Sequence, residues 1–451
     1  MTTQKPKRTS IIASDGLENV VAGLGTDRDK RSYSIYGAPR KLTPVELENM
    51  YRSSWLAKKI VNAVADDMTR AWRTLSSNET NHEQIGKVAQ AEKRVGLKAK
   101  VNEALRWARL YGGSAILIGT KDGDHSKPLV VEALKKGDLS WLRVVDNRRL
   151  TPNGGSLCND LTSENFGFPE SYLLAESSQA IHHSRVVRFN GQKLPYTAWQ
   201  ENAMWDDGEL QHVLDSITNC DTVTSSVASM LFEANVDVIK SEGLADLLAS
   251  DKGTEKVTKR FQTAALMKSF NRTLLLDGQE SYEKKSNSFA NLDKIIQQFM
   301  QNVSGAADIP MTRLFGQSAG GMNSTGDNEI RNYYDMLQAK QESELRPKLE
   351  YLDAVLVRSE IGQMPDDYGF EFNSLWQMSD KEKAETEKIR GDRDKIYFEM
   401  GVIDEGVIAG DLKEAGTYAN LTNEHVELAK QLAEKMRETE EEPKEPADEM
   451  Q

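Results

Sequence analysis

The spacing of the apolar residues changes along this chain, and that change constrains the fold most. Between residues 44 and 70 the apolar side chains recur at helical spacing: Leu47, Tyr51, Leu56, Ile60, Val61, Val64 and Met68. A second helical pattern runs from Leu97 to Ala108 and ends at the glycine pair 112–113. Four short apolar runs then predict strands: 114–119, 142–145, 171–174 and 186–189. We therefore expect an α+β fold in which 114–191 forms a sheet packed on the preceding helices.

The first helix has a recognisable start. Thr43 can cap it, Pro44 suits the first helical position, and Glu46 can bond back to the backbone N–H of Thr43. Residues 44–70 are predicted to form one long helix or two abutting helices. Residues 1–40 are rich in Lys, Arg, Ser, Thr and Gly and are expected to be a mobile arm.

Two amphipathic segments flank a small mixed module in the second half of the chain. Helices are predicted over 209–232 and 289–303. Between them, the pattern predicts a strand at 236–239, one or two helices within 244–270, and a hairpin that joins 273–276 to 281–284 across Asp277-Gly278.

A glycine-rich loop, 316–327, follows these elements. After it, apolar spacing predicts a helix of about thirty residues, which Pro347 must kink or split. Helices are also predicted over 380–401 and 424–437. The tail 438–451 holds seven acids, one Lys and two prolines, and is expected to be disordered.

Composition narrows the class of protein. A length of 451 residues corresponds to about three domains. The 57 Lys and Arg against 70 Asp and Glu give a net charge of −13, whereas proteins that grip DNA usually carry a basic excess, so any contact with nucleic acid should be local or weak. Cys158 and Cys220 are too few for a disulfide framework or a cysteine metal site. Neither a membrane span nor a secretory leader is apparent, so the chain is expected to stay in the cytoplasm.

Motifs for catalysis are weak. The 316–327 loop could cradle phosphates, but it lacks the Lys-Ser/Thr pair of a P-loop, so a flexible connection is favoured. His182 and His183 are adjacent and are expected to point to opposite faces of a strand, which argues against a shared metal. Asp66 and Arg70, four residues apart, are interpreted as a helix-surface pair. We expect no catalytic, cofactor-binding or metal-ligating residue.

Four segments, in order, resemble the portal proteins of tailed bacteriophages, in the branch related to proteins with an anti-CBASS N-terminal domain. They are Leu47–Trp72, Tyr111–Gly119, Ile181–Gly191 and Asp308–Pro347. The last is the most specific: an Ile-Pro pair, an Arg-Leu-Phe-Gly turn, a loop of small residues and a long helix that closes on Arg-Pro. The resemblance runs through about residues 40–420.

The resemblance implies a portal fold and a division of the chain. After the 1–40 arm, it implies a mixed wing (41–205), a first stem helix (206–234), a clip (235–286), a second stem helix (287–304), a tunnel loop (305–327), a kinked helix with a return to the wing (328–378) and a helical crown (379–437), before the 438–451 tail. It also implies a ring, expected to contain twelve copies, at a capsid vertex, assembled in the host cytoplasm and located in the virion. The implied partners are double-stranded DNA, the large terminase subunit, a head–tail adaptor, and the major capsid and scaffolding proteins, with no membrane.

The family's channel function suggests a role for the glycine-rich loop. A channel must centre DNA without gripping it, because each phosphate neutralised by Lys or Arg adds affinity that opposes sliding. We expect the uncharged loop to adapt to the duplex, with Arg313 and Arg331 as its nearby cations. The predicted loop residues are Gly316, Gln317, Ser318, Ala319, Gly320, Gly321, Met322, Asn323, Ser324, Thr325 and Gly326.

Two alternatives stay open. One is a virion scaffold or adaptor without a DNA channel. The other is an anti-defence cyclic-nucleotide phosphodiesterase, whose chemistry needs two His-x-Thr/Ser motifs with paired imidazoles. The chain offers only one such motif, His182-His183-Ser184.

Overall fold

The computed structural model describes residues 40–76, 82–121, 123–154, 157–163, 165–232, 235–240, 244, 248–271, 281–286, 291–317, 326–376, 380–414, 417–418 and 420–441. Most of the predicted 1–40 arm therefore lies outside the described residues. The chain divides into two units, Met1–Leu375 and Trp376–Gln451.

The first helices follow the predicted signals. Helix α1 (Pro44–Ser53) begins at the expected capping box: Thr43 Oγ1 accepts the Glu46 N–H at 3.3 Å, and Glu46 Oε2 accepts the Thr43 N–H at 2.8 Å. Ser54 then caps α2 (Trp55–Arg70), where its Oγ accepts the Ala57 N–H at 3.3 Å. Residues 44–70 are thus two abutting helices, one of the two predicted arrangements.

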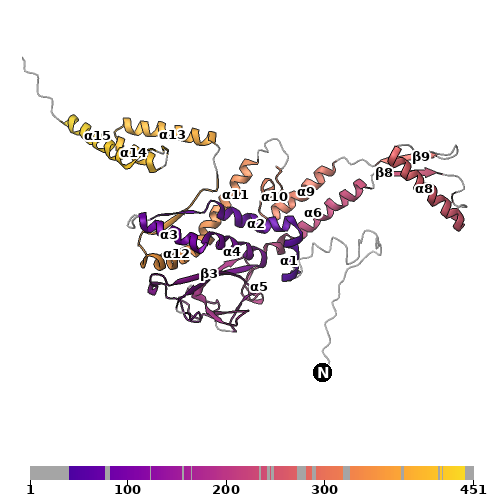
Figure 1. Ribbon diagram of the computed structural model, residues 1–451, viewed down its shortest axis with the longest axis horizontal. Coiled ribbons are helices and arrows are strands. Elements are labelled where there is room, and N and C mark those ends of the chain that lie inside the picture. Colours follow the sequence, from indigo (N-terminus) through magenta and orange to yellow (C-terminus); the bar gives the residue numbers. More distant parts are fainter. Residues whose placement is uncertain are drawn as a thin grey trace, which may run out of the picture. The chain divides into compact units, whose positions relative to one another are not determined.

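Helices form the larger part of the first unit. The other helices are α3 (His82–Val95), α4 (Leu97–Tyr111), α5 (Tyr196–Glu201), α6 (Glu209–Phe232), α8 (Asp251–Asn271), α9 (Leu292–Ala306), α10 (Met311–Phe315), α11 (Asp327–Lys340) and α12 (Arg346–Ile361). Helix α2 packs against α4 and α6 (Figure 1), and each contributes fully buried side chains to one core, such as Ile60, Val101 and Val213. Burial of these apolar faces is what holds the helices together.

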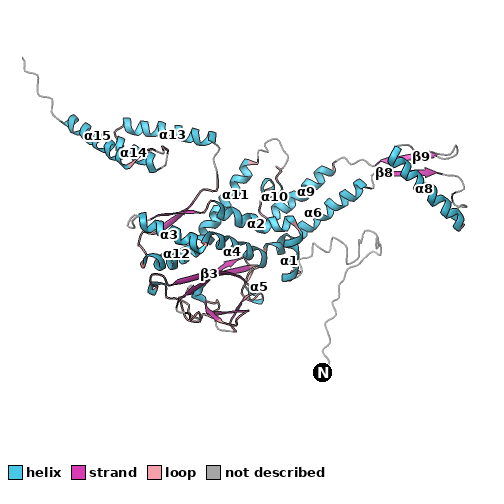
Figure 2. Ribbon diagram, in the orientation of Figure 1, coloured by secondary structure: helices cyan, strands magenta, loops and turns pink. Residues whose placement is uncertain are grey.

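The strands between α4 and α6 form two sheets rather than one. Strand β2 (Gly113–Thr120) is buried throughout and pairs antiparallel with β3 (Leu139–Asp146) and β7 (Val186–Asn190). The second sheet contains β4 (Leu150–Pro152), β5 (Ser171–Leu174) and β6 (Ala180–His182). Helix α4 packs against β2 and β3 (Figure 2), so the predicted packing of strands on helices is confirmed, but the single sheet is wrong. A separate pair joins β1 (Arg73–Ser76) to β10 (Gly369–Phe372).

The module between the amphipathic helices also contains strands. Helices α6 and α9 pack against each other (Figure 1), and the chain between them forms β8 (Asn235–Lys240), α8 and β9 (Ser281–Ser286). Strand β9 pairs antiparallel with β8. The other half of the expected hairpin, 273–276, lies outside the described residues.

The long helix after the loop is interrupted, as Pro347 predicts. A π turn over Gln341–Leu345 separates α11 from α12, and Pro347 lies in the first turn of α12, where no N–H is needed. Gln341 is fully buried and its Nε2 donates to Met68 O at 2.6 Å. The interruption therefore also attaches this helix to the end of α2.

The second unit is helical where it is described. It contains α13 (Asp380–Glu399), α14 (Glu405–Glu414) and α15 (Asn423–Glu441), and α14 packs against α15. Helix α15 continues through Glu441, four residues beyond the predicted end of this helix at residue 437; residues 442–451 of the predicted tail lie outside the described stretches. None of the described helices is long and apolar enough to cross a membrane.

Candidate functional site at the base of the glycine-rich loop

The predicted loop leaves from one helix end and returns at another. Helix α10 ends at Gly316 and α11 begins after Gly326; both glycines have positive φ, +75° and +71°, which favours glycine. Gly316, Gln317 and Gly326 are described, whereas residues 318–325 lie outside the described residues. The structure therefore defines the base of the loop.

The two ends of the loop meet closely. A β-carbon built on Gly326 lies 2.7 Å from Thr312 Cγ2, closer than any real side-chain contact. Only glycine therefore lets the start of α11 pack against α10 here.

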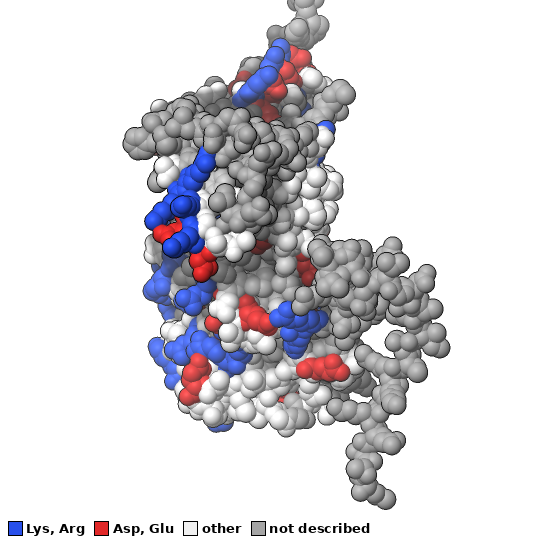
Figure 3. All heavy atoms as spheres, turned by 90° about the vertical axis from the view of Figure 1, so that its right-hand side faces the viewer, with Lys and Arg blue, Asp and Glu red and all other residues white. Residues whose placement is uncertain are grey.

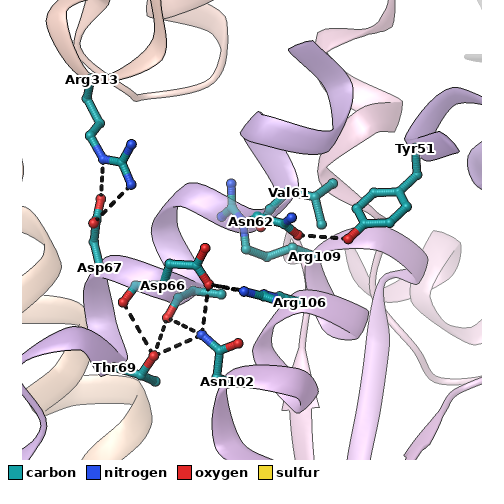
Figure 4. Close-up of polar contacts among 11 residues, drawn as sticks. Tyr51, Val61, Asn62, Asp66, Asp67, Thr69, Asn102, Arg106, Arg109 and Arg313 are labelled. Atoms are coloured by element: carbon teal, nitrogen blue, oxygen red, sulfur yellow. Dashed lines mark hydrogen bonds and ion pairs between the residues drawn. The ribbon is translucent and has the colours of Figure 1, made fainter. Parts of the chain in front are cut away.

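A single carboxylate joins both ends of the loop to α2, and Figure 4 shows its contact with Arg313 on one side. Asp67 Oδ2 accepts from Arg313 Nε at 2.8 Å and Asp67 Oδ1 from Arg313 Nη2 at 3.1 Å, a bidentate ion pair. The Tyr333 hydroxyl donates to Asp67 Oδ2 at 3.1 Å. Arg313 belongs to α10 and Tyr333 to α11, so Asp67 holds the residues on both sides of the loop.

This cluster is largely shielded from water. The Asp67 side chain is 4% exposed and that of Arg313 31% exposed. The hydrogen bond to Asp67 raises the pKa of Arg313, and burial raises the pKa of Tyr333, reinforced by the Asp67 charge. Both donors therefore keep their protons and stay bonded to the carboxylate.

The geometry changes the interpretation of the predicted cations. The Arg313 charge is engaged by Asp67 within the subunit, so it is not presented to a ligand as a bare cation. Arg331 lies exposed on α11.

The expected helix-surface pair of Asp66 and Arg70 is wrong. Asp66 Oδ1 instead accepts from Arg106 Nε at 3.0 Å and from Asn102 Nδ2 at 3.0 Å, both on α4 (Figure 4). Arg70 Nη2 donates to Leu375 O at 2.6 Å, and its guanidinium lies 5.2 Å from the centre of the Tyr334 ring. Asp66 bonds to these partners on α4 rather than to Arg70 on its own helix, because it faces α4, which supplies a guanidinium and an amide.

The adjacent histidines are also closer than expected. His182 ends β6 and His183 starts a 3₁₀ turn, so strand alternation stops between them and their ring centroids lie 4.4 Å apart. His182 Nδ1 accepts the backbone N–H of Ser184 at 3.2 Å. In the described part of the chain, no group of three or more His, Cys, Asp or Glu side chains is placed to hold a metal ion.

Sequence reasoning missed Asp67 and Tyr333 as residues of the loop base. A signal was present: Asp67 follows Ile60 and Val64 at helical spacing, on the apolar side of the helix. A carboxylate in that position must find a buried cation or donor. The sequence does not say which one, because Arg313 and Tyr333 lie 246 and 266 residues away.

Comparison with known proteins gives family-level matches. A family model described as phage portal protein matches residues 45–396. A protein of Caulobacter sp. (strain RHG1) named anti-CBASS protein Acb1 is 40% identical over 396 residues, which are 85% of this chain. The chain spans 62% of the length of that relative.

Two further matches cover most of this chain and most of the protein that it is compared with. An uncharacterized protein of Haemophilus influenzae is 30% identical over 430 residues, 95% of this chain and 96% of that protein. A chain from the neck of a native gene transfer agent particle, computed with C12 symmetry, has a TM-score of 0.46 at 12% identity and covers 81% of this chain and 92% of its own.

Proposed function

Because this chain belongs to the phage portal protein family, we propose that its copies close into a ring of twelve, through which double-stranded DNA is packaged into and ejected from a capsid. The observation that carries the proposal furthest is the base of the glycine-rich loop. A loop that contacts moving DNA needs fixed ends, and Asp67 supplies them on both sides.

The division of the chain implied by the family is part of this proposal. Helices α6 and α9 are the two stem helices, and the β8–α8–β9 module between them is the clip. The helices and sheets of 41–205, with the return through 328–378, are the wing, and 379–437 is the crown. Support comes from the packing of α6 on α9 and from the separation of the unit that begins at Trp376.

The loop residues Gly316–Gly326 line the narrowest part of the channel in this proposal. Of the two predicted cations, Arg313 is engaged by Asp67, and Arg331 lies exposed on α11. Sparse positive charge suits sliding, because each phosphate contact adds salt-dependent affinity. Figure 3 shows a face on which Lys and Arg gather along one edge with Asp and Glu among them, in a chain of net charge −13.

The proposed partners follow from the vertex location. The ring is a part of the virion that meets the large terminase subunit during packaging, a head–tail adaptor afterwards, and the major capsid and scaffolding proteins during assembly in the host cytoplasm. No membrane is involved.

Imaging of the purified protein by negative stain tests the ring. Views along the symmetry axis should show annular particles with a central hole. A protein that stays monomeric even with prohead components contradicts the proposal, and a closed assembly without a hole favours the scaffold or adaptor alternative.

Substitution of Gly320 and Gly321 by Trp tests the loop. Bulky side chains should narrow the channel and shorten the packaged DNA, measured by gel electrophoresis of DNA from filled heads. Gly154→Trp is the matched control: it adds the same side chain at an exposed glycine outside the predicted tunnel loop, where nothing lies within 4 Å of an added β-carbon. Packaging that is unchanged in the Trp variants removes the loop from the mechanism.

A second candidate function rests on the name of the Caulobacter relative, anti-CBASS protein Acb1. The chain has one His-x-Ser motif, and His182 Nδ1 lies 2.9 Å from Ser184 Oγ, so this imidazole is engaged locally. Incubation of the purified protein with cyclic oligonucleotides, followed by chromatography, distinguishes the portal function from the phosphodiesterase. Cleavage that is lost in His182→Gln establishes the phosphodiesterase. Substrate that stays intact rules it out and leaves the portal function as the one candidate of the two.

A further inference from the structure

A groove runs between α2, α3 and α4. Its volume is about 1480 Å³. Small-molecule sites usually occupy roughly 300–1,000 Å³, so this groove is large enough for a segment of polypeptide.

The floor of the groove is apolar and includes two tryptophans. Trp72, Leu75, Leu97 and Trp107 line it. The indole N–H groups are engaged, by Glu92 for Trp72 and by Glu103 at 3.1 Å for Trp107, and both rings are partly buried against the core while they line the groove. Tryptophans presented in this way are the usual anchors of interfaces.

The backbone at Trp72 is strained. Its φ is +56°, a value that bulky residues rarely adopt. Such strain persists where the surrounding structure enforces it, and it is concentrated at binding and functional sites.

The charges along the groove do not balance. Its acids are engaged: Asp66 by Arg106, Asp67 by Arg313, Glu92 by Arg73 and Trp72, and Glu103 by Trp107. Three exposed cations, Arg70, Lys93 and Lys98, have no carboxylate partner among the residues that the structure describes. An occupant with both apolar and acidic side chains fits this lining.

We propose that residues 9–27 of the same chain occupy this groove. The segment contains three acids, Asp15, Glu18 and Asp27, and no Lys, Arg or His. Leu17, Val20, Val21 and Leu24 stand at the spacing of one helix face. Its composition therefore matches both the apolar floor and the unpaired cations. DNA fits this groove less well, because its charged phosphates would contact the cations but not the apolar floor.

The segment is within reach of the groove. The described chain begins at residue 40, just before α1, and Tyr51 of α1 lies 6.2 Å, centroid to centroid, from the groove residue Trp107. The twelve residues 28–39 can span about 40 Å when extended. One copy therefore supplies both the groove and its occupant.

Hydrogen exchange of the full-length protein tests the proposal. Amides of residues 17–24 should exchange at least tenfold more slowly in the wild type than in Val21→Asp. The groove variant Lys93→Glu/Lys98→Glu should lose the same protection, whereas the matched control Lys136→Glu/Lys252→Glu, at exposed positions outside the groove, should keep it.

A charge swap separates the ionic contact from general damage. Asp15→Lys/Glu18→Lys added to the groove variant should restore protection of residues 17–24. Failure of this rescue, or a wild-type segment that exchanges as fast as Val21→Asp, overturns the proposal.

Docking of residues 9–27 does not depend on ring formation. Mass photometry of the same samples measures ring formation separately from the hydrogen exchange. Protection that persists in monomers supports docking within one copy even if no ring forms. Rings whose residues 17–24 are unprotected overturn the docking and leave the portal function standing.

Discussion

At the scale of single residues, the buried carboxylate of Asp67 links three helices. Its Oδ2 accepts from both Arg313 of α10 and Tyr333 of α11, on either side of the loop, and its Oδ1 accepts from Arg313. Removing one member of a buried ion pair leaves the other charge without compensation, which costs more than the pair itself contributes.

Asp67→Asn should lower the free energy of unfolding by about 1–3 kcal/mol, because a charged hydrogen-bonded pair becomes a weaker one while Arg313 keeps partial access to water. Urea denaturation followed by circular dichroism measures the change. Asp66→Asn is the control: its ion pair with Arg106 is more exposed, with 40% and 36% of the side chains accessible, and should cost less than about 1 kcal/mol. Equal losses in the two variants contradict the assigned role of Asp67.

The histidine pair makes stability depend on pH. Burial lowers the pKa of both His182 and His183 from the ordinary 6.5, and for His182 the neighbouring His183 lowers it further. The unfolded chain then binds more protons than the folded one just below pH 6.5, so the stability contribution is present above pH 6.5 and is lost as the pH falls through the folded pKa.

The variant His182→Gln/His183→Gln should therefore lose less stability than the wild type between pH 7 and pH 5. Urea midpoints measured across this range give the comparison. Parallel curves for the two proteins contradict the lowered pKa values.

At the scale of elements, β2 depends on glycine at both ends. A β-carbon on Gly113 lies 2.2 Å from Trp205 Cε3, and one on Gly119 lies 2.0 Å from Trp141 Cε2. Each glycine makes room for an indole ring over the strand. This is how the sheet accommodates these two tryptophans.

Gly113→Ala should destabilise the protein by about 1–3 kcal/mol, because Trp205 is 2% exposed and has no space to move away. Gly86→Ala is the matched control. It lies within α3 with nothing within 4 Å, so the better helix propensity of alanine should raise stability by up to about 1 kcal/mol. Thermal unfolding distinguishes the expected loss of stability in Gly113→Ala from the expected gain in Gly86→Ala. A Gly113→Ala variant of unchanged stability contradicts the packing argument.

Most elements with a sustained period were predictable from the sequence, whereas α3 and the short elements were not. The capped start of α1, strand β8 and the split before Pro347 follow from local signals. The three-residue strands β4 and β6 and the five-residue α10 are too short to show a period, and α14 carries two glycines that hide its helical pattern. Their formation depends on tertiary partners.

The same reason limits the prediction of the site. Local sequence gave the loop and its glycines, because small residues and chain breaks are visible in order along the chain. It gave Arg313 as a cation but not its neutralisation, since that depends on Asp67 from a helix far away in sequence.

At the scale of the whole molecule, the unit Trp376–Gln451 exposes more apolar surface than a solvated helical unit needs. Near the end of α13 the exposed side chains are Ile396 (53%), Tyr397 (44%), Phe398 (44%), Met400 (69%) and Val402 (67%). Patches of this kind mark surfaces that another molecule covers.

In the proposed ring, these residues should contact a neighbouring copy. Met400→Glu/Val402→Glu should therefore shift the particles toward monomers, measured by mass photometry, while the far-ultraviolet circular dichroism stays unchanged. Val45→Glu, which also replaces an exposed apolar residue (65% accessible), is the control. Rings that form equally well in both variants remove this surface from the assembly contacts.

The attachment of both α10 and α11 to one carboxylate of α2 has a consequence for how such chains can diversify. Whatever stretch of sequence connects Gln317 to Gly326 departs and returns at the same two points. Its length and chemistry can thus be exchanged without rebuilding the fold that carries it.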